Sequence, residues 1–405
     1  MNILVYQWGS VNDNTLQYEA EIWSRQQNQN ANVKFTFYYF YRKMTNYDMD
    51  PEFAMEMLEI VNQKKIDVIF SFNYFPMVSS ICNVTKIKYI SWIYDSPHKT
   101  LYSKTIFNQG NFIFIFDKQL LELVQSRGVT RVFYQPLAVS TEYFASKRDR
   151  EIEHYFSGVE LETIRSSVTF VGALYREHHG YYEDLAGIEK DTKTEIDSIL
   201  ENQIFSYKEN LVNSKMNESL ALEICEKAKL YLEDQKYLND PYEFAADLIR
   251  KKATAVERET ALMELSKQFP TAIYTNGKTA DLPQIMNYGY ADYDTKMPAI
   301  FQESAINLNI TLRSIQSGIS LRVLDILACG GFLITNWQQE IEDCFVIGEE
   351  LVTFESLEDL IIKTDYYLKH PEERMRIAKA GKKKVEELFS YKEAIESIAR
   401  KAMLI

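Results

Sequence analysis

Residues 306–335 read INLNITLRSIQSGISLRVLDILACGGFLIT. This stretch places two arginines and a short helix between two apolar strands. The run INLNI predicts a strand, and the Ser-Gly pair predicts a turn after it. Ser320 is a candidate cap for the helix LRVLDILA, a glycine pair ends that helix, and FLIT predicts the returning strand. Strand, turn, helix and returning strand form the repeating unit of a doubly wound α/β sheet.

This arrangement also predicts an anion site. A helix that begins where a strand ends offers free N–H groups and a favourable dipole to a negative group. Arg313 lies in the approach loop, whereas Arg322 and Asp325 are three residues apart and share one helix face. A diphosphate would bind the arginines, and a ribose diol would bind the carboxylate. The alternative is that Arg322 and Asp325 simply pair with each other.

The first third of the chain alternates apolar runs with helical patterns. The runs are NILVYQW, VKFTFYYF, IDVIFSF, IKYISWIY, NFIFIF and RVFYQPL. Between two of them, Asp50 followed by Pro51 predicts a helix cap with proline at the first helical position. Strands buried on both faces and separated by helices indicate a parallel, doubly wound sheet. Residues 1–150 are therefore predicted to form a Rossmann-like domain.

The pattern restarts at SVTFVGALY, residues 167–175, and predicts a second Rossmann-like domain over residues 165–385. Residues 180–268 are rich in Glu, Lys, Leu and Ala and predict a helical insertion. Strands are expected again at TAIYT, YGYADY, AINLNI, GFLIT and LVTF. The fold class is thus α/β, with two Rossmann-like domains that face a cleft, because such sheets bind ligands at the carboxyl ends of their strands.

Composition excludes several classes of protein. A formal net charge of −13 over 405 residues argues against nucleic acid as the main partner. The four cysteines are widely spaced, and His178 and His179 are adjacent, so no zinc or other metal site is expected. No apolar run reaches the length of a membrane span, and the amino terminus lacks the pattern of a signal peptide. We expect a cytoplasmic protein.

The segment TLRSIQSGISLRVLDILACGGFLITN resembles the donor-site segment of GT-B glycosyltransferases, and in particular that of the bacterial CgeB-like group, which is related to a spore maturation protein. Further blocks carry the same resemblance. They are YQWGSVNDN, YISWIYDSPH, IFIFDKQLLELVQSRGV, FYQPLAV, TFVGALYREHHGYYEDL, AIYTNGK and YYLKHPEERMRIAKAGKKKVEELFSY. The resemblance implies transfer of a sugar from a nucleotide donor, and it implies that residues 386–405 pack back on the first domain.

The resemblance also implies a donor site in the second domain, with basic groups and helix N-termini stabilising the leaving diphosphate without a metal or other cofactor. We expect a UDP-sugar donor. The expected donor-binding residues are Gly172, Arg176, Asn309, Arg313, Gly318, Arg322 and Asp325. Many retaining GT-B enzymes carry two glutamates eight positions apart here. Asp325 matches the second, but position 317 is serine, so the stereochemical course stays open.

The first domain is expected to hold the acceptor. WIYDSPH leaves a buried strand and carries Asp95 and His98 to its carboxyl end. A hydroxyl acceptor needs a proton acceptor within hydrogen-bond reach. Asp95 is the first choice for this catalytic base and His98 the second. The alternative is that Asp95 only caps a helix that begins near Pro97. WGSVNDN, residues 8–14, is the matching loop after the first strand, and two roles stay open for it: contact with either substrate, or a polar turn alone.

These patterns predict a hexosyl-transferring, metal-independent GT-B glycosyltransferase. Its acceptor would be a hydroxyl on a protein or a surface glycan, and its oligomeric state is open. Two other functions stay open. One is a nucleotide-sugar epimerase of the same fold, which would need no acceptor. The other is a non-catalytic sugar-nucleotide-binding or scaffold protein that docks through residues 180–268.

Overall fold

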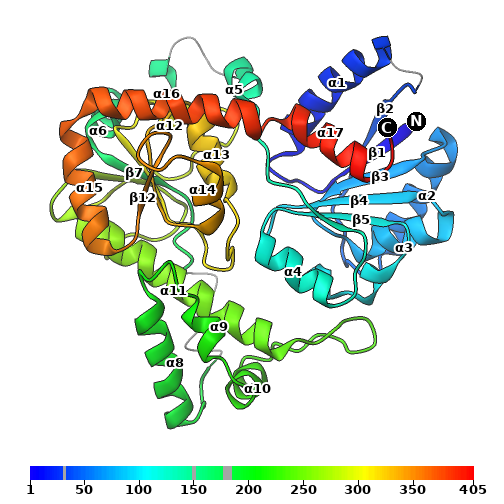
Figure 1. The fold of residues 1–405 in the computed structure, drawn as a ribbon, viewed down its shortest axis with the longest axis horizontal. Coiled ribbons are helices and arrows are strands. Elements are labelled where there is room, and N and C mark those ends of the chain that lie inside the picture. The colour runs from blue at the N-terminus through cyan, green and yellow to red at the C-terminus, as the bar shows by residue number, and fades with distance from the viewer. Residues whose placement is uncertain (31–32, 148–151, 177–184) are drawn as a thin grey trace. The chain divides into compact units, whose positions relative to one another are not determined.

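The computed structural model describes residues 1–30, 33–147, 152–176 and 185–405. They form two compact units, each with its own six-stranded sheet of parallel strands and flanking helices (Figure 1). Unit 1 comprises Met1–Tyr143, Leu232–Asn239 and Phe389–Ile405, and unit 2 comprises Phe144–Tyr231 and Asp240–Leu388. The predicted α/β class with two doubly wound sheets is confirmed.

Unit 1 has the strand order β2-β1-β3-β4-β5-β6. Its strands are β1 Asn2–Gln7, β2 Thr36–Tyr41, β3 Val68–Phe72, β4 Lys88–Ile93, β5 Asn111–Ile115 and β6 Val132–Tyr134. Its helices are α1 Asp13–Asn30, α2 Pro51–Lys64, α3 Pro76–Thr85, α4 Lys118–Ser126 and α17 Tyr391–Lys401, and α5 Thr141–Lys147 leads into unit 2. Because helices cover both faces, β3 and β5 are buried along their whole length.

Local sequence explains how one of these helices begins. Asp50 caps α2, with its side chain accepting a hydrogen bond from the Phe53 N–H at 3.0 Å, and Pro51 occupies the first helical position. The sequence-based prediction of this helix start is confirmed.

Two separate apolar clusters cover the two faces of the unit 1 sheet. One contains Phe53 and Met57 of α2, and the other contains Trp23 of α1 and Ile398 of α17. The C-terminal segment packs on this sheet, because Lys88 Nζ donates to the carbonyl oxygen of Ala402 at 2.8 Å. Leu232–Asn239 also belongs to unit 1.

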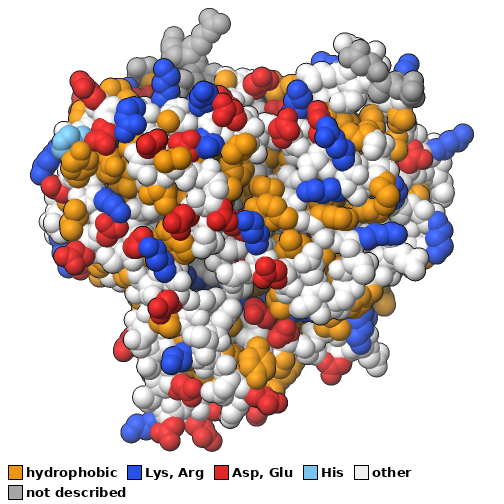
Figure 2. Space-filling model, in the orientation of Figure 1, with side chains coloured by type: hydrophobic (Ala, Val, Ile, Leu, Met, Phe, Trp, Pro, Cys, Tyr) orange, Lys and Arg blue, Asp and Glu red, His pale blue; other side chains and the backbone are white. Residues whose placement is uncertain are grey.

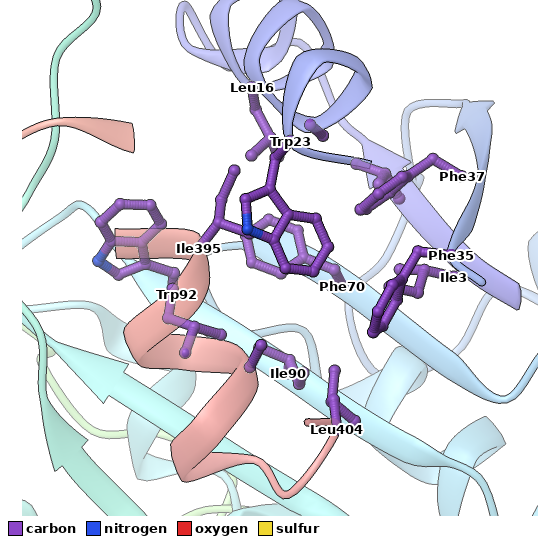
Figure 3. A pocket seen from close by; sticks show the side chains of 14 residues that line it. Ile3, Leu16, Trp23, Phe35, Phe37, Phe70, Ile90, Trp92, Ile395 and Leu404 are labelled. Atoms are coloured by element: carbon purple, nitrogen blue, oxygen red, sulfur yellow. The ribbon is translucent and has the colours of Figure 1, made fainter. Parts of the chain in front are cut away.

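A cavity of about 50 Å³ lies between α1, α17 and the unit 1 sheet (Figure 3). Its lining is apolar and includes Trp23, Phe70 and Ile395. Most of the lining side chains come from within the strands and from the two covering helices. The cavity therefore lies on a face of the sheet, away from the carboxyl ends of the strands where α/β sheets bind substrates.

Unit 2 has the strand order β12-β11-β10-β7-β8-β9. Its strands are β7 Val168–Val171, β8 Thr271–Tyr274, β9 Met286–Asn287, β10 Ile306–Asn309, β11 Leu333–Asn336 and β12 Val352–Phe354. The helices that flank the sheet or follow it are α6 Gly158–Ser166, α12 Lys296–Glu303, α13 Leu321–Ala328, α14 Gln339–Cys344, α15 Leu357–Lys369 and α16 Pro371–Leu388. The order reverses between β7 and β10, which makes their carboxyl ends the switch point of the sheet.

The insertion between β7 and β8 is helical, as predicted. It contains α8 Lys190–Gln203, α9 Leu211–Lys215, α10 Glu218–Lys227 and α11 Pro241–Ser266. Its helices share a core of their own that includes Ile199, Ile224 and Ile249. Toward its carboxyl end, α11 joins the core of the sheet through Leu262 and Leu265.

Two sequence-based predictions about local structure are wrong. YGYADY is irregular rather than a strand, because β9 pairs only over Met286–Asn287 and Gly289 then takes a left-handed φ of +78°. Ser320 occupies the cap position of α13, but its side chain makes no capping hydrogen bond. Its hydroxyl instead lies 3.3 Å from the Thr311 hydroxyl.

Candidate functional site

The switch point of unit 2 carries a buried arginine that the sequence patterns do not single out. Arg258 of α11 donates from Nη1 to the Ala173 carbonyl oxygen at 2.6 Å and from Nε to the Ile310 carbonyl oxygen at 3.0 Å. Ala173 and Ile310 lie just after β7 and β10, so the guanidinium sits where these two neighbouring strands end. The centroid of the Tyr175 ring lies 4.8 Å from the guanidinium carbon of Arg258.

This guanidinium is a buried positive charge. Arg258 is 8% exposed, and among the described residues no carboxylate forms a hydrogen bond with it. Burial and, less strongly, the nearby charge of Arg322 lower the pKa of Arg258 to about 10, against the opposing effects of Tyr175 and Glu257. Burying a charge that is only partly compensated costs free energy, so an anion bound here would offset part of this cost.

Arg322 and Asp325 come together on α13 as their spacing predicts. Arg322 Nη1 lies 3.4 Å from Asp325 Oδ2, and the Tyr293 hydroxyl donates to Asp325 Oδ1 at 3.0 Å. Burial raises the pKa of Asp325 to about 6, against the opposing effects of Arg322 and Tyr293. The Arg322 side chain is 29% exposed, so it keeps access to a ligand.

Arg313 is held by a carboxylate. Its Nε lies 3.1 Å from both oxygens of Glu257, which is fully buried, and its Nη1 donates to the Ser206 carbonyl oxygen at 2.8 Å. The ring of Tyr207 lies 4.2 Å from the guanidinium. In this structure Arg313 therefore ties the loop after β10 to the insertion rather than presenting a free cation.

Arg176 is also engaged with acidic residues. Its Nε donates to Glu259 at 3.0 Å and its Nη1 donates to Asp281 at 2.8 Å. Glu259 lies on α11 and Asp281 follows β8, so these ion pairs fix the loop after β7. The neighbouring Gly172 donates its N–H to the Tyr274 carbonyl oxygen at 3.1 Å and continues the pairing of β7 with β8.

Asn309 and Gly318 lie at the two ends of the loop between β10 and α13. Asn309 is buried, and its Nδ2 donates to the Thr311 hydroxyl at 3.0 Å and to the Thr335 hydroxyl at 2.9 Å. Next to Gly318, the Ser317 hydroxyl donates to Glu340 at 2.8 Å. Glu340, which the sequence patterns do not single out, thus places a carboxylate beside Ser317.

In unit 1, Asp95 and His98 lie together after β4. His98 Nδ1 is 4.0 Å from Asp95 Oδ2, and His98 Nε2 is 3.2 Å from the Tyr74 carbonyl oxygen. Burial lowers the pKa of His98, although Asp95 acts in the opposite direction. The alternative role of Asp95 as a helix cap is wrong, because the short helical turn here begins at Lys99 and His98 occupies its cap position.

The loop after β1 contributes a further acidic residue. Asp13 Oδ2 accepts hydrogen bonds from the N–H groups of Gly9 at 3.1 Å and Ser10 at 2.9 Å. Its Oδ1 is buried and has no hydrogen-bond partner within the part of the chain that the structure describes. Burial raises the pKa of Asp13 to about 6. Sequence reasoning marked this loop, residues 8–14, but not this carboxyl group.

Over residues 1–30, 33–147, 152–176 and 185–405, no group of three or more His, Cys, Asp or Glu residues is arranged to hold a metal ion. His178 and His179 lie outside the described residues. None of the helices described is long and apolar enough to span a bilayer. On the face shown in Figure 2, acidic and basic side chains are interspersed.

Comparisons with known proteins agree with this architecture. Residues 252–400 match the model of a glycosyl transferase-like family. No curated protein sequence matches the chain.

Solved structures that resemble the chain cover nearly all of it. Sucrose-phosphate synthase from Thermosynechococcus elongatus is 8% identical with a TM-score of 0.55, over 100% of this chain and 98% of that one. Anabaena HepE, solved in complex with UDP-glucose, is 7% identical with a TM-score of 0.56 over all of both chains. A glycosyltransferase from Rickettsia africae is 11% identical with a TM-score of 0.53, over 99% of this chain and 98% of that one. The chain has the GT-B fold of glycosyltransferases.

Proposed function

We propose that this chain is a GT-B glycosyltransferase of the CgeB-like group that transfers a hexose from a UDP-sugar to a hydroxyl group. One observation carries the proposal. The buried Arg258 guanidinium lies at the switch point of the unit 2 sheet with Arg322 nearby, where a diphosphate would neutralise both charges. The UDP-glucose bound in the structure of Anabaena HepE, which has the same fold, supports this choice of donor.

The unit 2 residues would act mainly through charge. Negative charge builds on the leaving diphosphate as the glycosidic bond breaks, and fixed cations in a low-dielectric site lower that barrier without a metal. Arg258 has five N–H groups. It donates three of them to the two strand-end carbonyl oxygens and also hydrogen-bonds with Tyr175, so one N–H remains for a phosphate oxygen. Arg322 supplies the more accessible charge.

The other expected donor residues take supporting roles in the proposal. Arg176 and Arg313 hold the loops after β7 and β10 through their carboxylate partners. Gly172, Asn309 and Gly318 shape the edge of the site. For Asp325 to accept a hydrogen bond from a ribose hydroxyl, the Tyr293 hydroxyl would have to give way.

In unit 1, Asp95 and His98 would receive the proton of the acceptor hydroxyl. We propose a protein or a surface glycan as the acceptor, and the cytoplasm as the place of reaction. Residues 1–150 would form the acceptor domain and residues 165–385 the donor domain, with the insertion at 180–268. Residues 386–405 would brace the acceptor domain.

Binding and turnover of a panel of UDP-sugars test the proposal. Arg322→Ala should weaken donor binding at least tenfold, because a charge-assisted hydrogen bond contributes roughly 1.5–3 kcal/mol. Asp95→Asn should leave donor affinity unchanged and depress transfer. Unchanged donor affinity in Arg322→Ala would show that the donor site is elsewhere.

Incubation with the donor alone separates this proposal from the other two functions. A transferase would at most hydrolyse the donor slowly, whereas an epimerase would produce the epimeric nucleotide sugar. Tight donor binding without turnover in the presence of any acceptor pool would instead indicate a non-catalytic binding protein.

A further inference from the structure

Asn73 lies at the carboxyl end of β3, between that strand and the end of β4. Its side chain makes three hydrogen bonds to the segment after β4. Oδ1 accepts from the N–H groups of Tyr94 at 2.9 Å and Asp95 at 3.2 Å, and Nδ2 donates to the Asp95 carboxylate at 2.7 Å. The oxygen and the nitrogen of this amide therefore both hold Asp95 in place.

The backbone around Asn73 is fixed as well. Its N–H donates to the Trp92 carbonyl oxygen at 2.8 Å, and its carbonyl oxygen accepts from the Ser71 hydroxyl at 2.8 Å. Asn73 is 2% exposed and takes a left-handed φ of +61°, a conformation that asparagine tolerates better than most residues. The amide thus has a defined position relative to both strands.

His98 faces the same carboxylate oxygen. A carbonyl oxygen can only accept a hydrogen bond, so the contact of Nε2 with Tyr74 requires the proton to be on Nε2. In neutral His98 the lone pair is then on Nδ1, which lies 4.0 Å from Asp95 Oδ2. A proton accepted at Nδ1 would form an imidazolium beside the Asp95 carboxylate, which would stabilise it.

We infer that Asn73 is a positioning residue that orients Asp95 toward His98, so that Nδ1 of His98 is the atom that accepts the acceptor's proton. This inference rests on the proposed transferase function for its chemistry. Asn73 touches no reacting atom and acts through Asp95. It is also distinct from a cap or a turn residue, because its side chain joins two neighbouring strands at the substrate-binding end of the sheet.

Among the described residues, the titratable groups near the Asp95–His98 pair have the following contacts. Asp95 is the charged group that acts on His98. Ser96 donates to Asp117, which caps α4, at 3.4 Å. The hydroxyls of Tyr74 and Tyr89 form hydrogen bonds with the hydroxyls of Thr105 and Ser71. A negative charge at position 73 should therefore act directly on the Asp95 carboxylate and, through it, on the protonation of His98.

The test uses two substitutions that keep the left-handed backbone. Asn73→Gly removes the amide, and Asn73→Asp retains an acceptor but sets a second carboxylate against Asp95. Lys86→Gly is the matched control, because Lys86 also has a φ of +61° but lies at the end of α3, outside this cluster. The measurements are UDP release from UDP-glucose between pH 5 and 9, and NMR titration of the His98 ring.

Asn73→Asp should raise the pH at which His98 loses its proton by about one unit, because a second negative charge favours the imidazolium. The acidic limb of the rate profile should move by the same amount. Asn73→Gly should lower kcat roughly 10- to 100-fold while the KM for UDP-glucose stays within about twofold, the split expected when only a transition-state interaction is lost. Lys86→Gly should change neither quantity.

An unmoved His98 titration in Asn73→Asp would overturn the inference. So would wild-type kcat in a folded Asn73→Gly variant. If the wild type neither binds nor hydrolyses any UDP-sugar, the proposed function fails, and the NMR titration, which needs no turnover, alone decides the role of Asn73.

Discussion

Arg258 donates its Nε–H to the carbonyl oxygen of Ile310 at 3.0 Å, just beyond the end of β10. The residue before it on α11, Glu257, instead pairs with Arg313. Two neighbouring residues of one helix therefore have different roles. Glu257 neutralises a cation that holds the insertion, whereas Arg258 keeps its positive charge at the switch point of the sheet.

The Arg313–Glu257 pair should contribute to stability more than to donor binding. Arg313→Ala would leave the fully buried Glu257 carboxylate without its partner, which should lower the free energy of unfolding by about 3–5 kcal/mol. Chemical denaturation followed by circular dichroism measures this change. The double variant Arg313→Met with Glu257→Leu should recover much of the loss, because it removes both charges. A double variant as unstable as Arg313→Ala would contradict this role.

Asp325 should make stability depend on pH in a defined direction. Its pKa is about 6 in the folded protein and 3.8 in the unfolded chain, so its contribution is fully present below pH 3.8 and is lost as the pH rises through 6. Asp325→Asn has no such ionisation. The variant should therefore gain stability relative to the wild type between pH 4 and pH 7, by at most about 3 kcal/mol.

Denaturation curves at several pH values measure this difference. Asp13 also has a raised pKa of about 6, but it is present in both proteins and cancels in the comparison. A stability difference that stays constant from pH 4 to pH 7 would show that Asp325 ionises normally in the folded state.

Two tyrosines on neighbouring strands of unit 1 provide a matched test of buried hydroxyl groups. Tyr6 of β1 donates to the Arg42 carbonyl oxygen at 2.9 Å. The hydroxyl of Tyr39 on β2 is buried and has no hydrogen-bond partner among the described residues. Tyr6→Phe should cost about 1 kcal/mol, whereas Tyr39→Phe should be neutral or stabilising, because it removes a desolvated group. Urea unfolding of both variants measures the change in the free energy of unfolding. Equal losses of stability in the two variants would contradict this prediction.

Much of the fold follows from local sequence. The apolar runs of unit 1 each become a strand, and Asp50 with Pro51 begins α2 as expected, because hydrophobic period and capping chemistry act over a few residues. YGYADY failed as a strand because one glycine and an edge position outweigh its β propensity.

The site is harder to predict, because it depends on contacts between distant segments. Arg313 and Arg322 stand out in a single motif, but the carboxylate that neutralises Arg313 lies 56 residues away. Arg258 lies in the charged helical run AVERET, residues 255–260, a pattern typical of a solvent-exposed helix face. Asn73 is one polar residue in SFNYFP, and only the pairing of β3 with β4 brings it to Asp95.

The most direct test of the donor site is calorimetric titration of UDP into the wild type and two variants of Arg258. Arg258→Lys keeps the charge but loses the planar fork and should bind UDP roughly tenfold more weakly, whereas Arg258→Met should bind roughly 100-fold more weakly. Arg165→Lys, a change in a half-exposed ion pair with Glu303, is the control and should bind normally. Wild-type UDP affinity in a folded Arg258→Met variant, or no UDP binding by the wild type, would contradict the account.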